Sequence, residues 1–316
     1  MHKSFRTSPP RKRDRQRGAA LLTAMIIVTL VATLAVSMVW QQWRSVQVEA
    51  AERARTQSAW ILGGALDWAR LILREDQRSG RPTALTEPWA VPLAEARLST
   101  FLAADKNNNT DDGPEAFLSG SIQDAQARYN LNNLIVNNAI VPTELATLER
   151  LCQTLGLDGS VPTRIAQGLR DANEAKTGNA PLLPRTVAQL VWLGIDAGTV
   201  RALEPYVVLL PIATGVNVNT APREVLVAAI PGNDVATSER LLQIRQRAPF
   251  KTLADFQAQA PSLNFKTAKL DVRSDFFEVR GRLRLSDRIL EERSLVRRLS
   301  TGQVVLLERE RVSSRE

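Results

Sequence analysis

The chain has 316 residues, of which 44 % are hydrophobic, so the part outside a membrane can bury a core. Its formal net charge is +8, but residues 1–18 hold seven of the 41 basic residues and one of the 33 acidic residues. The remaining chain therefore has a net charge of only +2. A nucleic-acid-binding body carries its own basic stripe, so this distribution argues against that class.

Residues 19–40 form the longest apolar run in the sequence and contain neither a charged residue nor a proline. A helix of about 20 such residues spans the roughly 30 Å hydrocarbon core of a bilayer. The run exceeds the apolar region of about 7–15 residues in a cleaved signal peptide. Basic residues next to a membrane span stay in the cytoplasm. The sequence therefore predicts an inner-membrane protein with a cytoplasmic N-terminus and a periplasmic body.

Gly18 and Ala19 lie between the basic residues and the apolar run, and a long helical pattern follows them. This order resembles the N-terminus of type IV pilin-like proteins, which the prepilin peptidase cleaves after a glycine. The resemblance implies cleavage between Gly18 and Ala19, although alanine replaces the usual large or aromatic residue. At the fifth mature position these proteins usually have glutamate, and this chain has Thr23. A subunit without that carboxylate suits the first position of a fibre better than a repeating position.

Few residues for catalysis remain after such cleavage. The only histidine, His2, precedes the cleavage site, so the mature chain has no Ser–His or Cys–His pair and no histidine ligand for zinc. The only cysteine, Cys152, cannot form an intramolecular disulfide. It recurs with Leu145, Leu148 and Leu155 at helical spacing, which favours a buried hydrophobic side chain over a redox or intermolecular role. We therefore predict a protein that is not an enzyme and has no cofactor.

Residues 41–78 lack proline, and Ser79-Gly80-Arg81-Pro82 follows them as a helix stop. Apolar or small residues recur every three or four positions and mark one face of this helix: Ala51, Ala54, Ser58, Ile61, Ala65, Trp68 and Ile72. The small residues of the first half predict packing against helices of partner subunits. The large residues of the second half predict packing on the protein's own body.

A polar stretch within residues 79–118 has alternating oxygen-bearing side chains, namely Asp105, Asn107, Asn109 and Asp111. This alternation is typical of a calcium loop. However, Thr110 replaces the glycine of loop position 6, and Ala116 replaces the glutamate of position 12. The pattern therefore favours a solvated turn rich in Asp and Asn, with calcium binding as the alternative.

The most specific string is GSIQDAQARYNLNNL at residues 120–134. It is similar to the G-x-I-x-D-A-x-x-R-[FY]-N-L-N-N-L segment of the minor pseudopilin K (GspK) family of type II secretion. That family also carries the VNVNTAP segment found at residues 216–222. Its members often have a longer acidic loop with calcium nearby. Here that loop is reduced to residues 171–178, which argues against a bound metal.

Residues 217–226 predict a helix with Thr220 as its N-cap and Pro222 in its first turn. The continuation through residue 256 resembles a helix-hairpin-helix module, which binds DNA phosphates through the backbone amides of a Gly-x-Gly hairpin. Here Asn233 and Asp234 follow Gly232, so the second glycine is missing and an acid stands where a phosphate would bind. The module therefore favours a structural role, and a membrane-anchored DNA receptor remains the alternative.

The C-terminal residues alternate apolar and polar side chains around Gly281, and Thr301-Gly302 predicts a hairpin turn. With the pseudopilin resemblance, this pattern implies an α+β fold. A long N-terminal transmembrane helix packs on a small antiparallel sheet, with a large all-helical insertion of the helix-hairpin-helix or SAM-like type. The expected divisions are a leader (1–18), the N-terminal helix (19–78), the first part of the body (79–135), the insertion (136–265) and a terminal β-meander (266–316).

The resemblance implies a minor pseudopilin that caps the pseudopilus tip and initiates its assembly for the export of folded proteins. Its expected partners are the minor pseudopilins I and J, the major pseudopilin, the prepilin peptidase, and the secretin or secreted proteins. Nucleic acid is not an expected partner. A minor pilin at the tip of a type IV pilus is a further alternative, because its N-terminus would follow the same pattern. The 120–134 string favours secretion.

Overall fold

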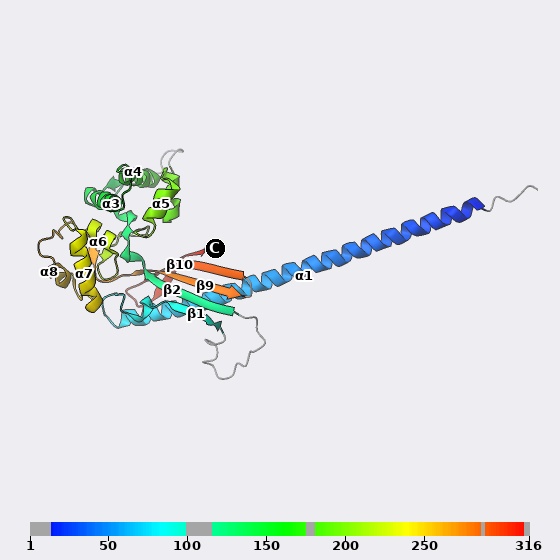
Figure 1. Cartoon of the computed structure of the whole chain (residues 1–316), viewed down its shortest axis with the longest axis horizontal. Helices are drawn as coiled ribbons and strands as arrows, with labels where there is room; N and C mark the ends of the chain where they lie inside the picture. The colour runs from blue at the N-terminus through cyan, green and yellow to red at the C-terminus, as the bar shows by residue number, and fades with distance from the viewer. Residues whose placement is uncertain (1–13, 99–115, 175–180, 286–287, 313–316) are drawn as a thin grey trace, which may run out of the picture. The chain divides into compact units, whose positions relative to one another are not determined.

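The computed structural model describes residues 14–98, 116–174, 181–285 and 288–312. The chain has two compact units, Met1–Trp60 and Ile61–Glu316. In the first unit the described residues belong to one helix, α1 (Asp14–Arg78), which continues into the second unit (Figure 1). The predicted helix stop is confirmed, because Gly80 adopts a φ of +68° and the helix ends before it.

The buried face of α1 in the second unit differs from the predicted face. Leu62, Leu66 and Leu73 are 0–7 % exposed, whereas Trp68, expected in the core, is 51 % exposed. The apolar part of this helix is wider than the surface that the rest of the unit covers. The large leucines bury the most apolar area and therefore select the contact face.

The body contains a five-stranded antiparallel sheet in the order β1-β2-β9-β10-β11. The predicted C-terminal meander is confirmed, and Gly302 lies in its last turn with a φ of +80°. The strands are β1 (Leu93–Arg97), β2 (Ala116–Asp124), β9 (Phe276–Leu285), β10 (Arg288–Arg298) and β11 (Val304–Val312).

One face of the sheet packs on α1 and the other carries part of the helical region. Phe277 and Val279 of β9 form a core with Leu66 and Leu73 of α1, and the ring of Trp89 packs edge-on against Phe277 at 5.2 Å. On the opposite face, the adjacent Phe276 packs with Val208 and Leu210. Successive side chains of a strand point to opposite faces, so one strand serves both cores.

Most of the helices lie between β2 and β9 in the chain (Figure 1). Three 3-10 helices, η2 (Ala125–Ala127), η3 (Leu131–Leu134) and η4 (Val187–Leu193), join them, while η1 (Pro88–Ala90) follows α1. The α-helices of this region are α3 (Pro142–Thr154), α4 (Val161–Glu174), α5 (Ala197–Leu203), α6 (Arg223–Ala229), α7 (Val235–Arg247) and α8 (Leu253–Ala258).

Short strand pairs also occur here, which the sequence patterns did not predict in full. Two pairs are parallel and one is antiparallel. The pairs are β3 (Tyr129–Asn130) with β6 (Val207–Val208), β7 (Val216–Asn217) with β8 (Leu270–Asp271), and β4 (Ile135–Val136) with β5 (Ala139–Ile140). Each of these strands is only two residues long.

The helical region has its own large core, which includes Leu148, Leu226 and Phe256. Cys152 belongs to it and is 1 % exposed, as predicted for a buried hydrophobic side chain. Burial raises the pKa of its thiol to about 11, so the reactive thiolate is scarce at neutral pH.

Candidate assembly site

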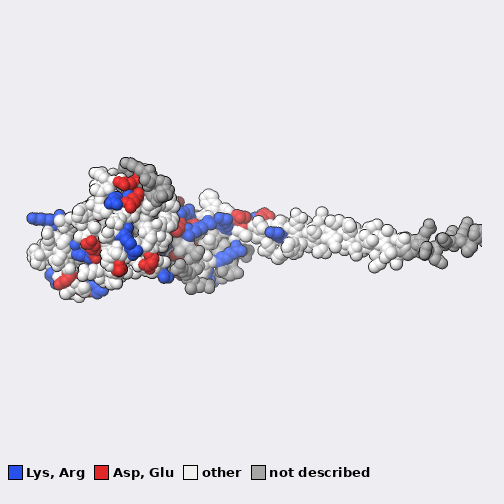
Figure 2. Space-filling model, turned by 90° about the horizontal axis from the view of Figure 1, so that it is seen from above, with Lys and Arg blue, Asp and Glu red and all other residues white. Residues whose placement is uncertain are grey.

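The apolar run of α1 is exposed within its own unit. Among the described residues, α1 is the only helix long and apolar enough to cross a membrane. The large hydrophobic side chains from Leu21 to Trp40 are 57–70 % exposed, and Figure 2 shows this stretch without charged side chains. Water-soluble proteins rarely expose so large an apolar surface, so lipid or other helices must cover it. By length and composition, this segment can cross a membrane.

The expected processing site lies at the start of this segment. Gly18 and Ala19 are both within α1, and the Thr23 hydroxyl donates to the carbonyl oxygens of Ala19 and Ala20, each at 3.0 Å. The uncharged hydroxyl is therefore satisfied within its own helix and needs no partner amine. Cleavage after Gly18 remains a prediction.

The candidate calcium ligands Asp105, Asn107, Asn109 and Asp111 lie outside the described residues. Within the described ranges, no group of three or more His, Cys, Asp or Glu side chains is placed to hold a metal ion.

The face of α1 opposite its buried leucines carries uncovered apolar residues. Trp68 is 51 % exposed and Leu71 is 49 % exposed. Gly64 precedes Trp68 by one helical turn, and a Cβ atom there would meet no atom of the described chain within 4 Å. Because residues three or four apart share a helix face, Gly64, Trp68 and Leu71 form one stripe. We call these three residues the α1 stripe.

A buried polar cluster joins the sheet to the helical region. Asp124, at the end of β2, accepts hydrogen bonds through Oδ2 from the hydroxyls of Thr220 and Ser274, each at 2.6 Å. Asn217 Nδ2 donates to the same oxygen at 2.9 Å. All four side chains are at most 6 % exposed. We call Asp124, Asn217, Thr220 and Ser274 the Asp124 cluster.

This cluster explains why the two strings that resemble the pseudopilin K family contain polar residues at buried positions. Burial raises the pKa of Asp124, and the donated hydrogen bonds oppose that rise. The predicted N-cap role of Thr220 is wrong, because Pro222 occupies the N-cap position of α6 and Thr220 binds Asp124 instead.

The asparagines of the 120–134 string fix the loop that follows β6. Asn130 accepts from the Leu210 amide at 3.1 Å and donates to the Ile212 carbonyl at 2.8 Å. Asn133 donates to the Thr214 carbonyl at 2.8 Å and accepts from its amide at 3.0 Å. The string therefore holds together segments about 80 residues apart, which is an architectural role.

The hairpin between α6 and α7 is not arranged for phosphate binding. Gly232 adopts a φ of +77°, as a hairpin requires, but the Asp234 side chain caps α7 by accepting from the Thr237 amide at 2.7 Å. Hydrogen bonding to Thr237 lowers the pKa of Asp234, so this helix end already holds an anion. On the face seen in Figure 2, both signs of charge are interspersed over the body. These features disfavour DNA binding.

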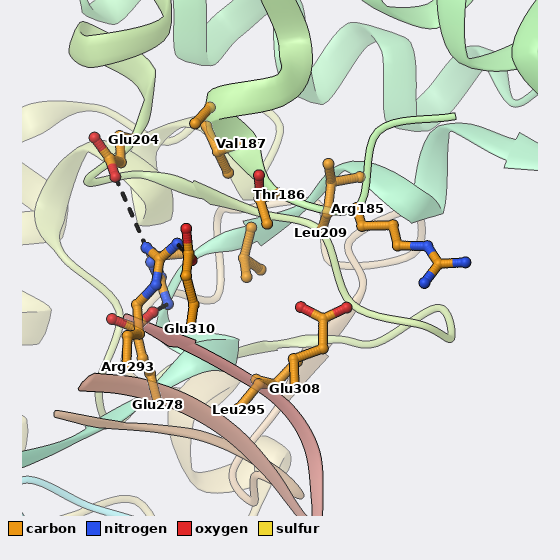
Figure 3. A pocket seen from close by; sticks show the side chains of 13 residues that line it. Arg185, Thr186, Val187, Glu204, Leu209, Glu278, Arg293, Leu295, Glu308 and Glu310 are labelled. Carbon is orange, nitrogen blue, oxygen red and sulfur yellow. Dashed lines mark hydrogen bonds and ion pairs between the residues drawn. The ribbon is translucent and has the colours of Figure 1, made fainter. Parts of the chain in front are cut away.

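A small cleft of about 70 Å³ lies between the helical region and β10 and β11 (Figure 3). Several of its charges are paired: Arg293 binds Glu310 at 2.7 Å and lies 3.9 Å from Glu204. Arg128 binds Glu278 at 2.9 Å. The cleft lining contains neither histidine nor cysteine. It therefore holds ion pairs that join the helical region to the sheet, and it lacks a nucleophile with an adjacent base.

Comparison with known proteins identifies the family. Two family models, both described as type II secretion system (T2SS), protein K, match residues 127–212 and 216–274. Type II secretion system protein K of Pseudomonas aeruginosa is 28 % identical, over 93 % of this chain and 92 % of that protein. The protein K of Pectobacterium carotovorum is 29 % identical, over 94 % and 97 %. That of Klebsiella pneumoniae is 29 % identical, over 90 % and 93 %.

A solved structure supports the same fold. A chain in the crystal structure of the GspK-GspI-GspJ complex from the enterotoxigenic Escherichia coli type 2 secretion system aligns with a TM-score of 0.65. The two chains are 20 % identical, and the alignment covers 84 % of this chain and 99 % of that one. The pilin-like architecture and the full-length relatives agree: the chain is a minor pseudopilin that is similar over nearly its whole length to type II secretion system protein K.

Proposed function

We propose that this minor pseudopilin caps the pseudopilus tip and initiates its assembly, and that it acts without catalytic activity. The helical region between β2 and β9 carries the proposal, because it adds a large separate core to one side of the pilin-like sheet. Such a bulky addition hinders stacking of identical subunits and is compatible with a terminal position. Residues 79–135 and 266–316 then form the pilin-like body, and residues 136–265 form the insertion.

The proposed topology follows from the anchor. Residues 1–18 form a cytoplasmic leader, the Ala19–Trp40 segment crosses the inner membrane, and the body lies in the periplasm. The prepilin peptidase cleaves after Gly18. The N-terminal helix then leaves the bilayer sideways and joins the helices of other pseudopilins. The neutral Thr23 supports this step, because its hydroxyl binds within its own helix.

The proposed partners are minor pseudopilins of the I and J types, the major pseudopilin, and the secretin or secreted proteins. The similar solved chain comes from a complex with two other pseudopilins, GspI and GspJ. In the present chain the α1 stripe offers an uncovered helix face for such contacts. Helices that pack together bury apolar residues at this spacing and come closest where one of them is glycine.

Replacement of Thr23 tests the proposal. Thr23→Glu restores the carboxylate of a repeating subunit, and we expect it to reduce secretion and increase the number of copies incorporated per pseudopilus. Thr23→Gln keeps a similar size without the charge, and Thr23→Ser keeps the hydroxyl, so both serve as controls. Secretion and pseudopilus composition are measured in a strain that lacks the native copy. Unchanged behaviour of Thr23→Glu in both assays would contradict the proposed role of the neutral residue.

A further inference from the structure

The end of α1 holds a buried carboxyl group with an unused oxygen. The Asp76 side chain is 7 % exposed, and its Oδ2 accepts a hydrogen bond from Arg298 Nη1 at 2.7 Å. Its Oδ1 atom is buried and has no hydrogen-bond donor within the described part of the chain. A buried oxygen without a donor is costly, so its surroundings need an explanation.

A second buried carboxyl group lies next to it. The Glu87 side chain is 6 % exposed, and its Oε2 accepts from Trp89 Nε1 at 2.8 Å and from the Ala84 amide at 3.3 Å. Its Oε1 lies 3.9 Å from the Nε of Arg81, whose side chain is 62 % exposed. Printed contacts aside, the chain itself brings the two carboxyl groups together: Arg298 donates to both Asp76 and Thr83, and the amide of the next residue, Ala84, donates to Glu87.

Two adjacent buried carboxylates repel each other unless a positive charge or a proton compensates. Arg298 binds Asp76 directly and compensates one negative charge. Burial raises the pKa of Glu87, the neighbouring Asp76 raises it further, and the Trp89 hydrogen bond only partly opposes these effects. Asp76 is paired with Arg298 at 2.7 Å, whereas Arg81 lies 3.9 Å from Glu87. Glu87 is therefore the group that takes the proton.

We infer that Glu87 is protonated in the folded protein and donates a hydrogen bond to Asp76 Oδ1. The resulting hydrogen bond links Glu87, in the segment that follows α1, to Asp76, near the end of α1. Through Arg298, which also donates to Thr83 Oγ1 at 2.7 Å and to the Ser274 carbonyl, the pair connects to the Asp124 cluster. Loss of the proton places a second anion in this interior and weakens the connection.

The other charged groups around the pair do not reproduce this behaviour. Arg81 and Arg298 are the basic side chains that face the pair. Arg273 Nη2 donates a hydrogen bond to the Gly80 carbonyl oxygen at 2.5 Å. Asp124 is a second buried acid whose pKa burial raises, but its oxygens bind Ser274, Thr220, Asn217 and the Gln126 amide. Its contribution is separated by replacing Glu87 alone.

The test compares the thermal unfolding of the full chain in detergent with that of Glu87→Gln, from about pH 5 to pH 9. Glutamine mimics the protonated acid, because its amide donates to Asp76 and its oxygen accepts from Trp89. An acid with a raised folded-state pKa loses stability as pH rises from its ordinary value, 4.5, to the folded value. We therefore expect the Tm of Glu87→Gln to exceed that of the wild type by an amount that grows by a few degrees with pH and then levels off.

Two further measurements complete the test. Glu95→Gln is the control, because Glu95 pairs with Arg284 at a 49 % exposed site and should show no such growth with pH. Infrared difference spectra of wild type minus Glu87→Gln at about pH 6 should contain the carbonyl stretch of a protonated carboxylic acid. If Glu87→Gln does not fold, the same band must titrate away in the wild type as the pH rises. A pH-independent Tm difference, or absence of the band, would overturn the inference.

Discussion

The Thr220 hydroxyl donates a hydrogen bond of 2.6 Å to Asp124 Oδ2, although the two residues are 96 positions apart in the sequence. Asp124 ends β2 of the pilin-like sheet, and Thr220 precedes α6 of the helical region. Ser274, which precedes β9, donates to the same oxygen. One buried carboxylate therefore sets where the helical region leaves and rejoins the sheet.

We predict that Asp124→Asn destabilises the protein by about 2–4 kcal/mol, because an amide nitrogen in place of Oδ2 leaves buried hydroxyls without an acceptor. Urea unfolding of the full chain in detergent measures the effect. Glu149→Gln, at an exposed position on α3, is the matched control and should change stability by less than about 0.5 kcal/mol. Equal stability of Asp124→Asn and the control would show that the cluster does not hold the helical region in place.

Gly120 should tolerate no side chain. A Cβ atom at this position of β2 would lie 2.7 Å from the Arg280 carbonyl oxygen of β9. Backbone atoms of paired strands cannot move apart without breaking the ladder, so Gly120→Ala should cost about 1–3 kcal/mol. Gly159→Ala is the control, since its added carbon meets nothing within 4 Å. Thermal unfolding distinguishes the two, and a control that loses as much stability as Gly120→Ala would refute this account.

Much of the long helix and the sheet could be predicted from sequence, because these elements depend on local patterns. The absence of proline from residues 41–78, the stop at Gly80 and the alternation around Gly281 each indicate a single conformation. The buried face of α1 was assigned wrongly, since Ile61, Ala65 and Trp68 have the same spacing as Leu62, Leu66 and Ala69. Only the position of the sheet decides between the two sets.

The polar clusters were not predictable in the same way. Thr220 was assigned as an N-cap because a single sequence reports its local preference and not a partner 96 positions away. Glu87 and Asp76 carried no signal, since isolated acids are usually exposed. The string at residues 120–134 indicated the family, but the contacts of Asn130 and Asn133 with the loop at residues 210–214 appear only in the fold.

The stability that Glu278 contributes should depend on pH in the opposite direction to the stability that Glu87 contributes. Burial alone would raise the pKa of Glu278, but Arg128 and Arg280 bind it and lower the pKa below its ordinary value of 4.5. A lowered folded-state pKa gives stability that is present above the ordinary value and is lost as pH falls through the folded value. Glu278→Gln should therefore be less stable than the wild type at about pH 7, by roughly 1–3 kcal/mol.

That difference should shrink as the pH falls below 4.5, because the unfolded wild-type chain then takes up a proton at Glu278 that the folded chain takes up only at lower pH. Unfolding curves recorded from about pH 3 to pH 7 measure it. Glu310→Gln removes the partner of Arg293 at a 55 % exposed site and should have a smaller effect at every pH. A difference for Glu278→Gln that stays constant across the range would contradict the assigned ion pairs.

The α1 stripe should contribute to partner binding and little to the stability of this chain. Trp68→Ala removes a large side chain that is 51 % exposed, so we expect a Tm change within a few degrees. Co-purification with the I-type and J-type minor pseudopilins should fall at least tenfold if Trp68 anchors the contact, as buried tryptophans do in interfaces. Val91→Ala, which alters a 72 % exposed side chain outside α1, is the control. If Trp68→Ala co-purifies with these partners as well as the wild type does, the α1 stripe is not part of the interface.

The central claim is that this chain enters a pseudopilus as a processed, membrane-anchored subunit. Intact mass and N-terminal sequencing of the protein extracted from membranes, with and without the prepilin peptidase, test it most directly. We predict a chain that starts at Ala19 only when the peptidase is present. A chain that still starts at Met1 in the presence of the active peptidase would make the first 40 residues an ordinary anchor and would contradict the proposed route into the pseudopilus.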